Sequence, residues 1–122
     1  MKKTNYLDLT PVTMMDHRMA EETKADILVP RFRKGFWREV YRQSKKGEYI
    51  YIHLDATGTA IWLMIDGNLK VHDICKKMNE KFPGLFRQAG DAEKRVTQFL
   101  SLLYQQRYIT FKEIISGNNA SG

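Results

Sequence analysis

The sequence predicts an α+β fold in which a three-stranded antiparallel sheet is followed by a three-helix bundle. Runs in the first half place apolar residues at every second position, which is typical of half-buried strands. Runs in the second half place them three and four residues apart, which is typical of amphipathic helices. With 122 residues, 43% of them hydrophobic, the chain suits one domain with a modest core.

Two segments near the N-terminus are predicted to form a hairpin. Residues 14–21 are a weak strand candidate in which apolar and polar residues alternate, and residues 25–32, "ADILVPRF", are a stronger one. The polar "EETK" between them is typical of a turn. Pro30 limits where the second strand can pair, because proline has no backbone N–H.

Residues 48–54, "EYIYIHL", form the clearest predicted strand. Side chains alternate between the two faces of a strand. One face would carry Ile50, Ile52 and Leu54, and the other Tyr49, Tyr51 and His53. The second set fits an ordinary row of solvent-facing residues as well as it fits a binding surface.

A basic link, "RKGFWREVYRQSKK" at 33–46, joins the second and third predicted strands. Its aromatic residues recur at helical spacing, so a short amphipathic helix is expected. It could lie on a membrane or an anionic partner. The commoner arrangement, which we favour, is a crossover whose aromatic side chains pack on the core.

Three helices are expected in the second half, at about 57–65, 71–82 and 91–106. The first is apolar nearly all round and should be buried; Asp55 or Thr57 would cap it, and "DGN" would end it. Gly58 in its first turn indicates a close approach of another backbone, because glycine costs helix stability. The inward residues would be Val71, Ile74, Cys75, Met78 and Phe82 in the second helix, and Val96, Phe99, Leu100 and Leu103 in the third.

The domain is expected to span 12–115, with a β-rich half at 12–54 and the helices at 55–107. Residues 1–11 would form an N-terminal arm, and the polar residues 116–122 a disordered tail. The run "YITFKEI" at 108–114 is strand-like and would either close the sheet or form a wing.

Composition restricts the class of protein. A net charge of +6 favours an anionic partner: nucleic acid, an acidic peptide or a membrane surface. The single cysteine, Cys75, excludes an internal disulfide and a multi-cysteine zinc site, and its place on an apolar stripe indicates burial. No apolar run is long enough to cross a bilayer and no signal peptide is evident, so a cytoplasmic protein is expected.

Catalysis is not supported by the motifs. His17, His53 and His72 are scattered, without the spacing of a metal site, and no glycine-rich phosphate loop is present. Ser44 and Ser101 lack the context of a nucleophile. We therefore expect neither an enzyme nor a bound cofactor or metal.

DNA binding is the main alternative among binding functions. Three helices after a sheet, in a basic chain, resemble a winged helix-turn-helix, whose third helix would read DNA through Lys94, Arg95, Thr97 and Gln98. However, the connection "PGLFRQAGD" is longer than the turn of the simple motif. The basic residues also concentrate at 31–46 and not on that helix.

Peptide binding fits the pattern better. An edge strand at 48–54 would offer unpaired N–H and C=O groups to a strand from another chain. If the third helix packs beside it, the two form a cleft. The same exposed edge allows a strand-swapped homodimer.

The order of the motifs resembles the PqqD-like family. Its members show a pattern of the form L-N/D-x-x-G-x-x-I/V-W, then D-G, a Val/Ile-rich helix and a last helix that exits through a glycine. The matching residues are Leu54, Asp55, Gly58, Ile61, Trp62, Asp66, Gly67, Val71, Ile74 and Phe82. The exit departs from the pattern, because it reads Arg107-Tyr108-Ile109 with no glycine. The basic link 33–46 is also longer than in compact members.

The resemblance implies a small winged helix-turn-helix-like domain that acts as a peptide chaperone, or precursor peptide recognition element. Such a domain binds the leader of a ribosomally made precursor peptide as an added strand between its third strand and third helix. It presents that peptide to a maturation enzyme, commonly a radical SAM enzyme. The basic link could dock this enzyme or cover a sheet edge. The peptide-binding residues carried onto this chain are Tyr49, Ile50, Tyr51, Ile52, His53, Leu54, Arg95, Gln98, Phe99 and Leu102.

Overall fold

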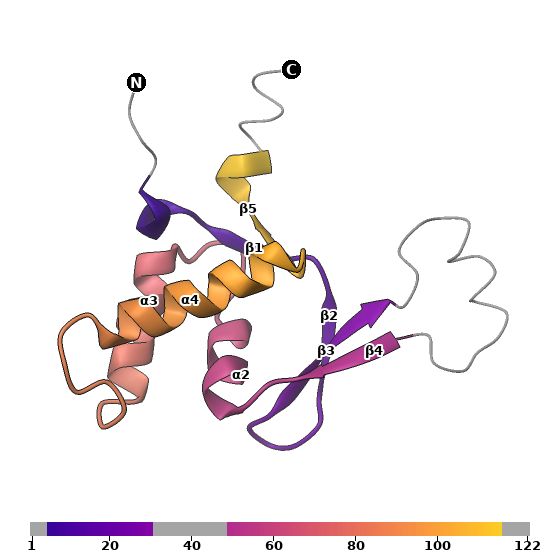
Figure 1. Ribbon diagram of the computed structural model, residues 1–122, viewed down its shortest axis with the longest axis horizontal. Coiled ribbons are helices and arrows are strands. Elements are labelled where there is room, and N and C mark those ends of the chain that lie inside the picture. Colours follow the sequence, from indigo (N-terminus) through magenta and orange to yellow (C-terminus); the bar gives the residue numbers. More distant parts are fainter. Residues whose placement is uncertain (1–4, 31–48, 116–122) are drawn as a thin grey trace, which may run out of the picture. The chain divides into compact units, whose positions relative to one another are not determined.

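The computed structural model describes residues 5–30 and 49–115, so the predicted basic helix at 33–46 and the predicted tail at 116–122 lie outside the described residues. The fold is α+β, with a three-stranded antiparallel sheet and helices (Figure 1). The chain divides into two compact units, residues 15–59 and residues 1–14 with 60–122. Each unit is described by itself below.

The unit at 15–59 is built on a sheet of strands β2 (Asp16–Met19), β3 (Ala25–Pro30) and β4 (Tyr49–His53), in that order. Both pairings are antiparallel, which confirms the predicted hairpin between β2 and β3. The "EETK" turn closes through the C=O of Lys24, which accepts hydrogen bonds from the N–H groups of Ala20 and Glu21.

Pro30 lies at the end of the central strand, where its missing N–H removes no bond to β2. The last residue of β3 opposite β2 is Leu28, which faces Asp16. The amide of Pro30 would point to the β2 side, because amide directions alternate along a strand. Since β2 begins only at Asp16, no residue of β2 faces Pro30, and proline is tolerated at this place in the central strand.

Helix α2 (Ala56–Leu63) begins with Asp55 as its cap. The Asp55 carboxylate accepts from the Gly58 N–H at 2.7 Å. In the same turn the Thr59 hydroxyl accepts from the Ala25 N–H at 2.9 Å, which ties the helix start to the start of β3. The helix ends two residues earlier than predicted, because the N–H groups of Met64 and Ile65 bond three residues back and tighten the last turn into 3-10 geometry.

The other unit holds the two amphipathic helices α3 (Val71–Lys81) and α4 (Asp91–Gln105), which pack side by side (Figure 1). Their apolar stripes are buried as predicted, except that Phe82 and Phe99 are only half-buried. Leu63, in the segment expected to be buried all round, is 51% exposed. The core residues of this unit include Ile61, Trp62, Ile65, Val71, Ile74, Met78, Val96, Leu100, Leu103, Ile109 and Phe111.

A second sheet, which the sequence analysis did not predict, joins the two ends of the described chain. Strand β1 (Pro11–Thr13) pairs antiparallel with β5 (Ile109–Phe111) in a two-stranded ribbon. The expectation that the run at 108–114 could close the three-stranded sheet is therefore wrong. The reason is the segment before β1: a 3-10 helix, η1 (Tyr6–Asp8), packs on α3 and brings β1 within reach of β5.

Two hydrogen bonds between Thr10 and Glu113 hold one end of the ribbon, where the chain enters β1 and leaves β5. One Glu113 carboxylate oxygen accepts from the Thr10 N–H at 2.7 Å and the other from the Thr10 hydroxyl at 2.8 Å. These bonds lower the pKa of Glu113 in spite of its partial burial, which alone would raise it. At the same end, Phe111 packs edge-on against Tyr6, with ring centroids 5.6 Å apart, and is tilted against Tyr104 at 5.3 Å.

Helix α4 ends in a Schellman motif whose left-handed residue is an arginine. The Tyr108 N–H donates to the Leu103 C=O at 2.9 Å, and the Arg107 N–H donates to the Tyr104 C=O at 3.0 Å. Arg107 has φ 66°, and it is the single non-glycine residue with positive φ among those that the structure describes. This is the position at which the family pattern places glycine, and the geometry gives the reason.

We expect Arg107→Gly to stabilise the fold by up to about 1 kcal/mol. Relief of left-handed strain, about 1–2 kcal/mol, exceeds the extra chain entropy of glycine in the unfolded state, about 0.5–1 kcal/mol. Urea unfolding measures the difference. In the matched control Gln105→Gly, glycine enters a right-handed helical position and should lower stability. Equal losses in both variants would contradict the assigned strain.

Candidate functional site

The outer edge of β4 is the candidate binding edge. β4 is the last strand in the order β2-β3-β4, so within the described ranges no strand pairs with its second side. The Leu54 N–H donates to the Ala25 C=O at 2.9 Å, which fixes the direction of every amide before it. By alternation, Ile50 and Ile52 bond toward β3, whereas the N–H and C=O groups of Tyr51 and His53 point outward.

The side chains of β4 divide between the two sheet faces. Ile50 and Ile52 share a face with Ile27 and Val29, which are buried in β3, although Ile50 itself is 43% exposed. Tyr49, Tyr51 and His53 lie on the opposite face. The predicted division of the strand is therefore confirmed, and the tyrosine–histidine face is more than a solvated row because it carries a polar network.

That network is a row of three side chains across the three strands, Arg18, Asp26 and His53, which stand opposite one another in the register. The Asp26 side chain is 3% exposed. Its carboxylate accepts from His53 Nδ1 at 2.6 Å and from Arg18 Nε at 3.1 Å. The Arg18 guanidinium also stacks over the Tyr51 ring at 4.0 Å.

The network keeps Asp26 ionised. The hydrogen bond from His53 is the largest cause that lowers the pKa of Asp26, and the bond from Arg18 adds to it, against a smaller opposing effect of burial. Because an ionised carboxylate only accepts, Nδ1 of His53 carries the proton in this contact. The other ring nitrogen, Nε2, takes no part in the contact with Asp26, and the His53 side chain is 78% exposed at the candidate edge.

The helical residues predicted for the site share one face of α4. Arg95, Gln98, Phe99 and Leu102 follow the spacing i, i+3, i+4, i+7. Leu102 is 53% exposed, Gln98 is exposed, and Arg95 and Phe99 are half-buried, with the Arg95 guanidinium 6.0 Å from the Phe99 ring centroid. The helix thus presents a partly apolar face beside its buried stripe.

The strand and the helix belong to different compact units, β4 to residues 15–59 and α4 to residues 60–122. The predicted strand residues are neighbours within the first unit, and the predicted helical residues are neighbours on one face of α4 within the second. Sequence reasoning missed Arg18 and Asp26. A signal for Asp26 was present, because an acid inside the apolar run "ADILV" must be paired if it is buried.

No group of three or more metal-ligating side chains occurs in the described ranges. Burial, followed by the nearby Glu93 carboxylate, raises the pKa of the Cys75 thiol to about 11, which makes it a poor nucleophile. None of the helices in these ranges is both long and apolar enough to cross a lipid bilayer.

The described residues define a small α+β protein with an open strand edge of the kind that can accept a strand from another polypeptide. The chain belongs to the PqqD family: residues 43–109 match the family described as coenzyme PQQ synthesis protein D. That match includes β4 and the helices α2, α3 and α4.

Curated relatives carry the name "PqqA binding protein". The one from Klebsiella pneumoniae (strain 342) is 37% identical over 60 residues, which are 49% of this chain and 61% of that protein. The one from Rahnella aquatilis is 27% identical over 88 residues, 69% of this chain and 88% of that protein. The chain thus spans about three fifths of the first relative's length. No solved structure matches the chain significantly.

Acid should weaken the fold through Asp26. Because its pKa is lower in the folded state, its stabilising contribution is complete above the ordinary aspartate pKa of about 3.9 and is lost as the pH falls through the folded value. Urea midpoints at pH 7 and pH 3 should therefore differ more for the wild type than for Asp26→Asn. The matched control is Asp16→Asn, which removes an exposed carboxylate on β2 and should keep the pH dependence of the wild type. An equal pH dependence in wild type and Asp26→Asn would contradict the network.

Cys75 should react slowly with thiol reagents in the folded protein. A pKa of about 11 leaves a thiolate fraction at pH 8 roughly a hundredfold or more below that of a free cysteine. Iodoacetamide labelling followed by mass spectrometry measures the rate, and labelling in denaturant should restore it. Fast labelling of the native protein would show that the thiol is accessible and activated.

Proposed function

We propose that the chain is a non-catalytic adaptor that binds the leader of a ribosomally synthesised precursor peptide by strand addition along β4. It presents that peptide, in the cytoplasm, to a modifying enzyme of the radical SAM type. The observation that carries the proposal is the outer edge of β4, with which no strand of the described residues pairs, in a member of the PqqD family. The name of the curated relatives, PqqA binding protein, supports a peptide as the ligand.

Strand addition suits this edge for a physical reason. The outward N–H and C=O groups of Tyr51 and His53 would form ladder bonds with a partner strand whatever its sequence, which supplies affinity. Specificity would come from the side chains. A residue of the added strand would lie beside Tyr51, and another could donate a hydrogen bond to Nε2 of His53.

Pre-organisation strengthens the case for the tyrosine–histidine face. The contacts of Asp26 with His53 and of Arg18 with Tyr51 hold both side chains before a peptide arrives. Less conformational entropy is then lost on binding. In this proposal the second wall is α4, whose residues Arg95, Gln98, Phe99 and Leu102 contact the apolar side chains of the peptide.

The charge of the chain suits an acidic leader. A net charge of +6 would accelerate the encounter with an anionic peptide more than it would tighten the complex. The basic segment 33–46, in this proposal, contacts the modifying enzyme. We propose that the chain only presents the peptide and that the modifying enzyme performs the covalent chemistry.

Removal of a single outward amide should weaken peptide capture. Tyr51→Pro deletes an N–H that faces the open edge, and we expect about a tenfold loss of affinity for a labelled leader peptide. Tyr51→Ala is the matched control, because it removes the same side chain and keeps the N–H. Fluorescence anisotropy measures both variants, with circular dichroism to verify folding. The probes are PqqA and the short precursor-like peptides encoded beside the gene.

Amide hydrogen exchange of the peptide complex provides a second measurement, which reports the mode of binding. A bound strand should slow exchange at Tyr51 and His53, while Ile50 and Ile52, already bonded toward β3, should change little. Uniform protection along β4, or none, would exclude the proposed mode of binding. Equal affinities of Tyr51→Pro and Tyr51→Ala would exclude it as well.

A duplex DNA titration separates the adaptor from a winged-helix regulator. A peptide adaptor should bind DNA weakly and without sequence preference. Tight, sequence-specific binding of labelled duplex, with a steep dependence on salt, would overturn the proposal in favour of a transcriptional regulator.

A further inference from the structure

A pocket lies between the β1–β5 ribbon and the end of α4. Its volume is about 500 Å³, within the range of ligand-binding pockets. All of its lining residues belong to the unit formed by 1–14 and 60–122. The lining residues are Met14, Tyr104, Gln105, Arg107, Ile109, Thr110 and Ile114.

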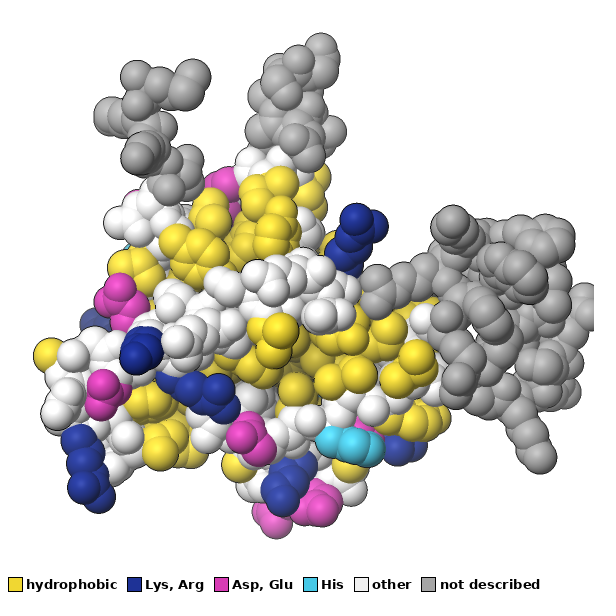
Figure 2. Space-filling model, viewed as in Figure 1, with side chains coloured by type: hydrophobic (Ala, Val, Ile, Leu, Met, Phe, Trp, Pro, Cys, Tyr) yellow, Lys and Arg dark blue, Asp and Glu magenta, His cyan; other side chains and the backbone are white. Residues whose placement is uncertain are grey.

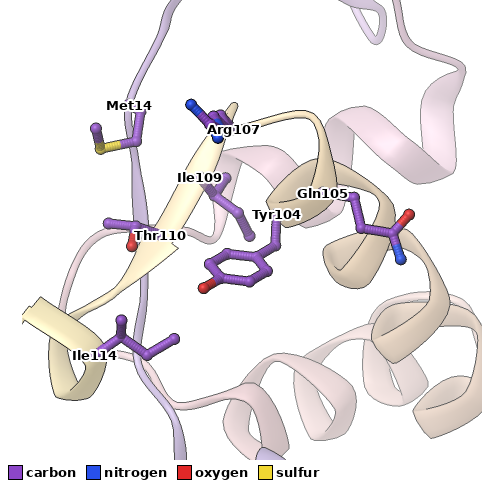
Figure 3. Close-up of a pocket in the computed structure, with 7 residues that line it drawn as sticks. All are labelled: Met14, Tyr104, Gln105, Arg107, Ile109, Thr110 and Ile114. Atoms are coloured by element: carbon purple, nitrogen blue, oxygen red, sulfur yellow. The ribbon is translucent and has the colours of Figure 1, made fainter.

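The side chains give the pocket an apolar body with one cationic end. In Figure 3 the Tyr104 ring and Ile114 lie toward one end, and Met14 and Arg107 lie at the other. The space-filling view shows hydrophobic side chains gathered over β5 and the residues that follow it (Figure 2). Several are strongly exposed for their type: Met14 by 57%, Tyr104 by 40% and Ile115 by 44%.

Arg107 is the residue that gives this pocket its chemistry. It occupies a left-handed position, φ 66°, at which glycine would be less strained. Among the described residues, its guanidinium forms no ion pair. The nearby Glu113 carboxylate accepts hydrogen bonds from Thr10 at both of its oxygens.

We propose that this pocket docks an acidic polypeptide segment of a partner protein, one that carries a large apolar side chain next to an aspartate or glutamate. The apolar side chain would fill the space between Met14, Ile109 and Tyr104. The neighbouring carboxylate would pair with Arg107, whose planar guanidinium can bind both oxygens.

Two observations favour a polypeptide over a small molecule. Exposed methionine, tyrosine and arginine side chains are enriched at protein interfaces, and here they form an open patch in place of an enclosed cavity. The net charge of +6 also complements an acidic partner. This surface uses none of the β4 residues, so the inference does not depend on leader binding there.

The test uses the full ¹⁵N-labelled chain and a synthetic acidic peptide, acetyl-EFDL-amide, with the neutral isostere acetyl-QFNL-amide as the comparison. The acidic peptide should shift the amide resonances of Tyr104, Ile109 and Thr110, and should bind about tenfold or more tightly than the neutral one. Arg107→Gly should remove that difference without lowering the midpoint of thermal unfolding. Arg87→Gln removes an exposed charge outside the pocket and should leave the difference intact.

Each alternative has its own outcome. Equal binding of the two peptides to the wild type, or an unchanged difference in Arg107→Gly, would overturn the proposal. Binding of 3-phenylpropionate as tight as that of the acidic peptide would assign the pocket to a small carboxylate instead. If deletion of 116–122 shifts the same resonances as the peptide, the occupant is the chain's own C-terminal segment. Leader capture at β4 should be unaffected by Arg107→Gly, so failure here leaves the adaptor proposal standing.

Discussion

The pairing of β4 with β3 is the constraint on which the candidate site depends. A strand has a period of two, so a slip of one residue would exchange every inward amide for an outward one and every buried side chain for an exposed one. Two contacts at the same end of the ladder resist such a slip. Leu54 bonds to Ala25, and Ala25 in turn donates to Thr59 in the first turn of α2. The helix start therefore sets which amides of β4 remain open.

The Asp26 network extends that constraint to the side chains. A carboxylate buried in the central strand is tolerable only with partners, and Asp26 has one on each neighbouring strand, Arg18 and His53. The arrangement links the outer strands through the centre of the sheet. It also orients Tyr51 and His53 at the edge of the sheet, which connects the stability of the sheet with the recognition proposed for that edge.

In the other unit, the end of α4 likewise places a structural constraint beside a candidate binding surface. The Schellman motif turns the chain back so that β5 can pair with β1, and a glycine would make that turn with less strain. An arginine stands there instead, and its side chain lines the pocket beside the ribbon. Strain kept at one residue is understood if its side chain has a use.

The sequence by itself determined the local elements, because period-two and period-3.6 patterns need only neighbouring residues. It therefore predicted β3, β4, α3 and α4 closely and offered Asp55 as one of two caps for α2, and the order of its motifs indicated the family. Long-range pairing was decided by the tertiary structure. The β1–β5 ribbon joins segments about a hundred residues apart, and β1 is too short to carry a pattern of its own. The same holds for the partners of Asp26 and for the direction of each β4 amide: a sequence names the donors and acceptors, but only the register decides which of them meet.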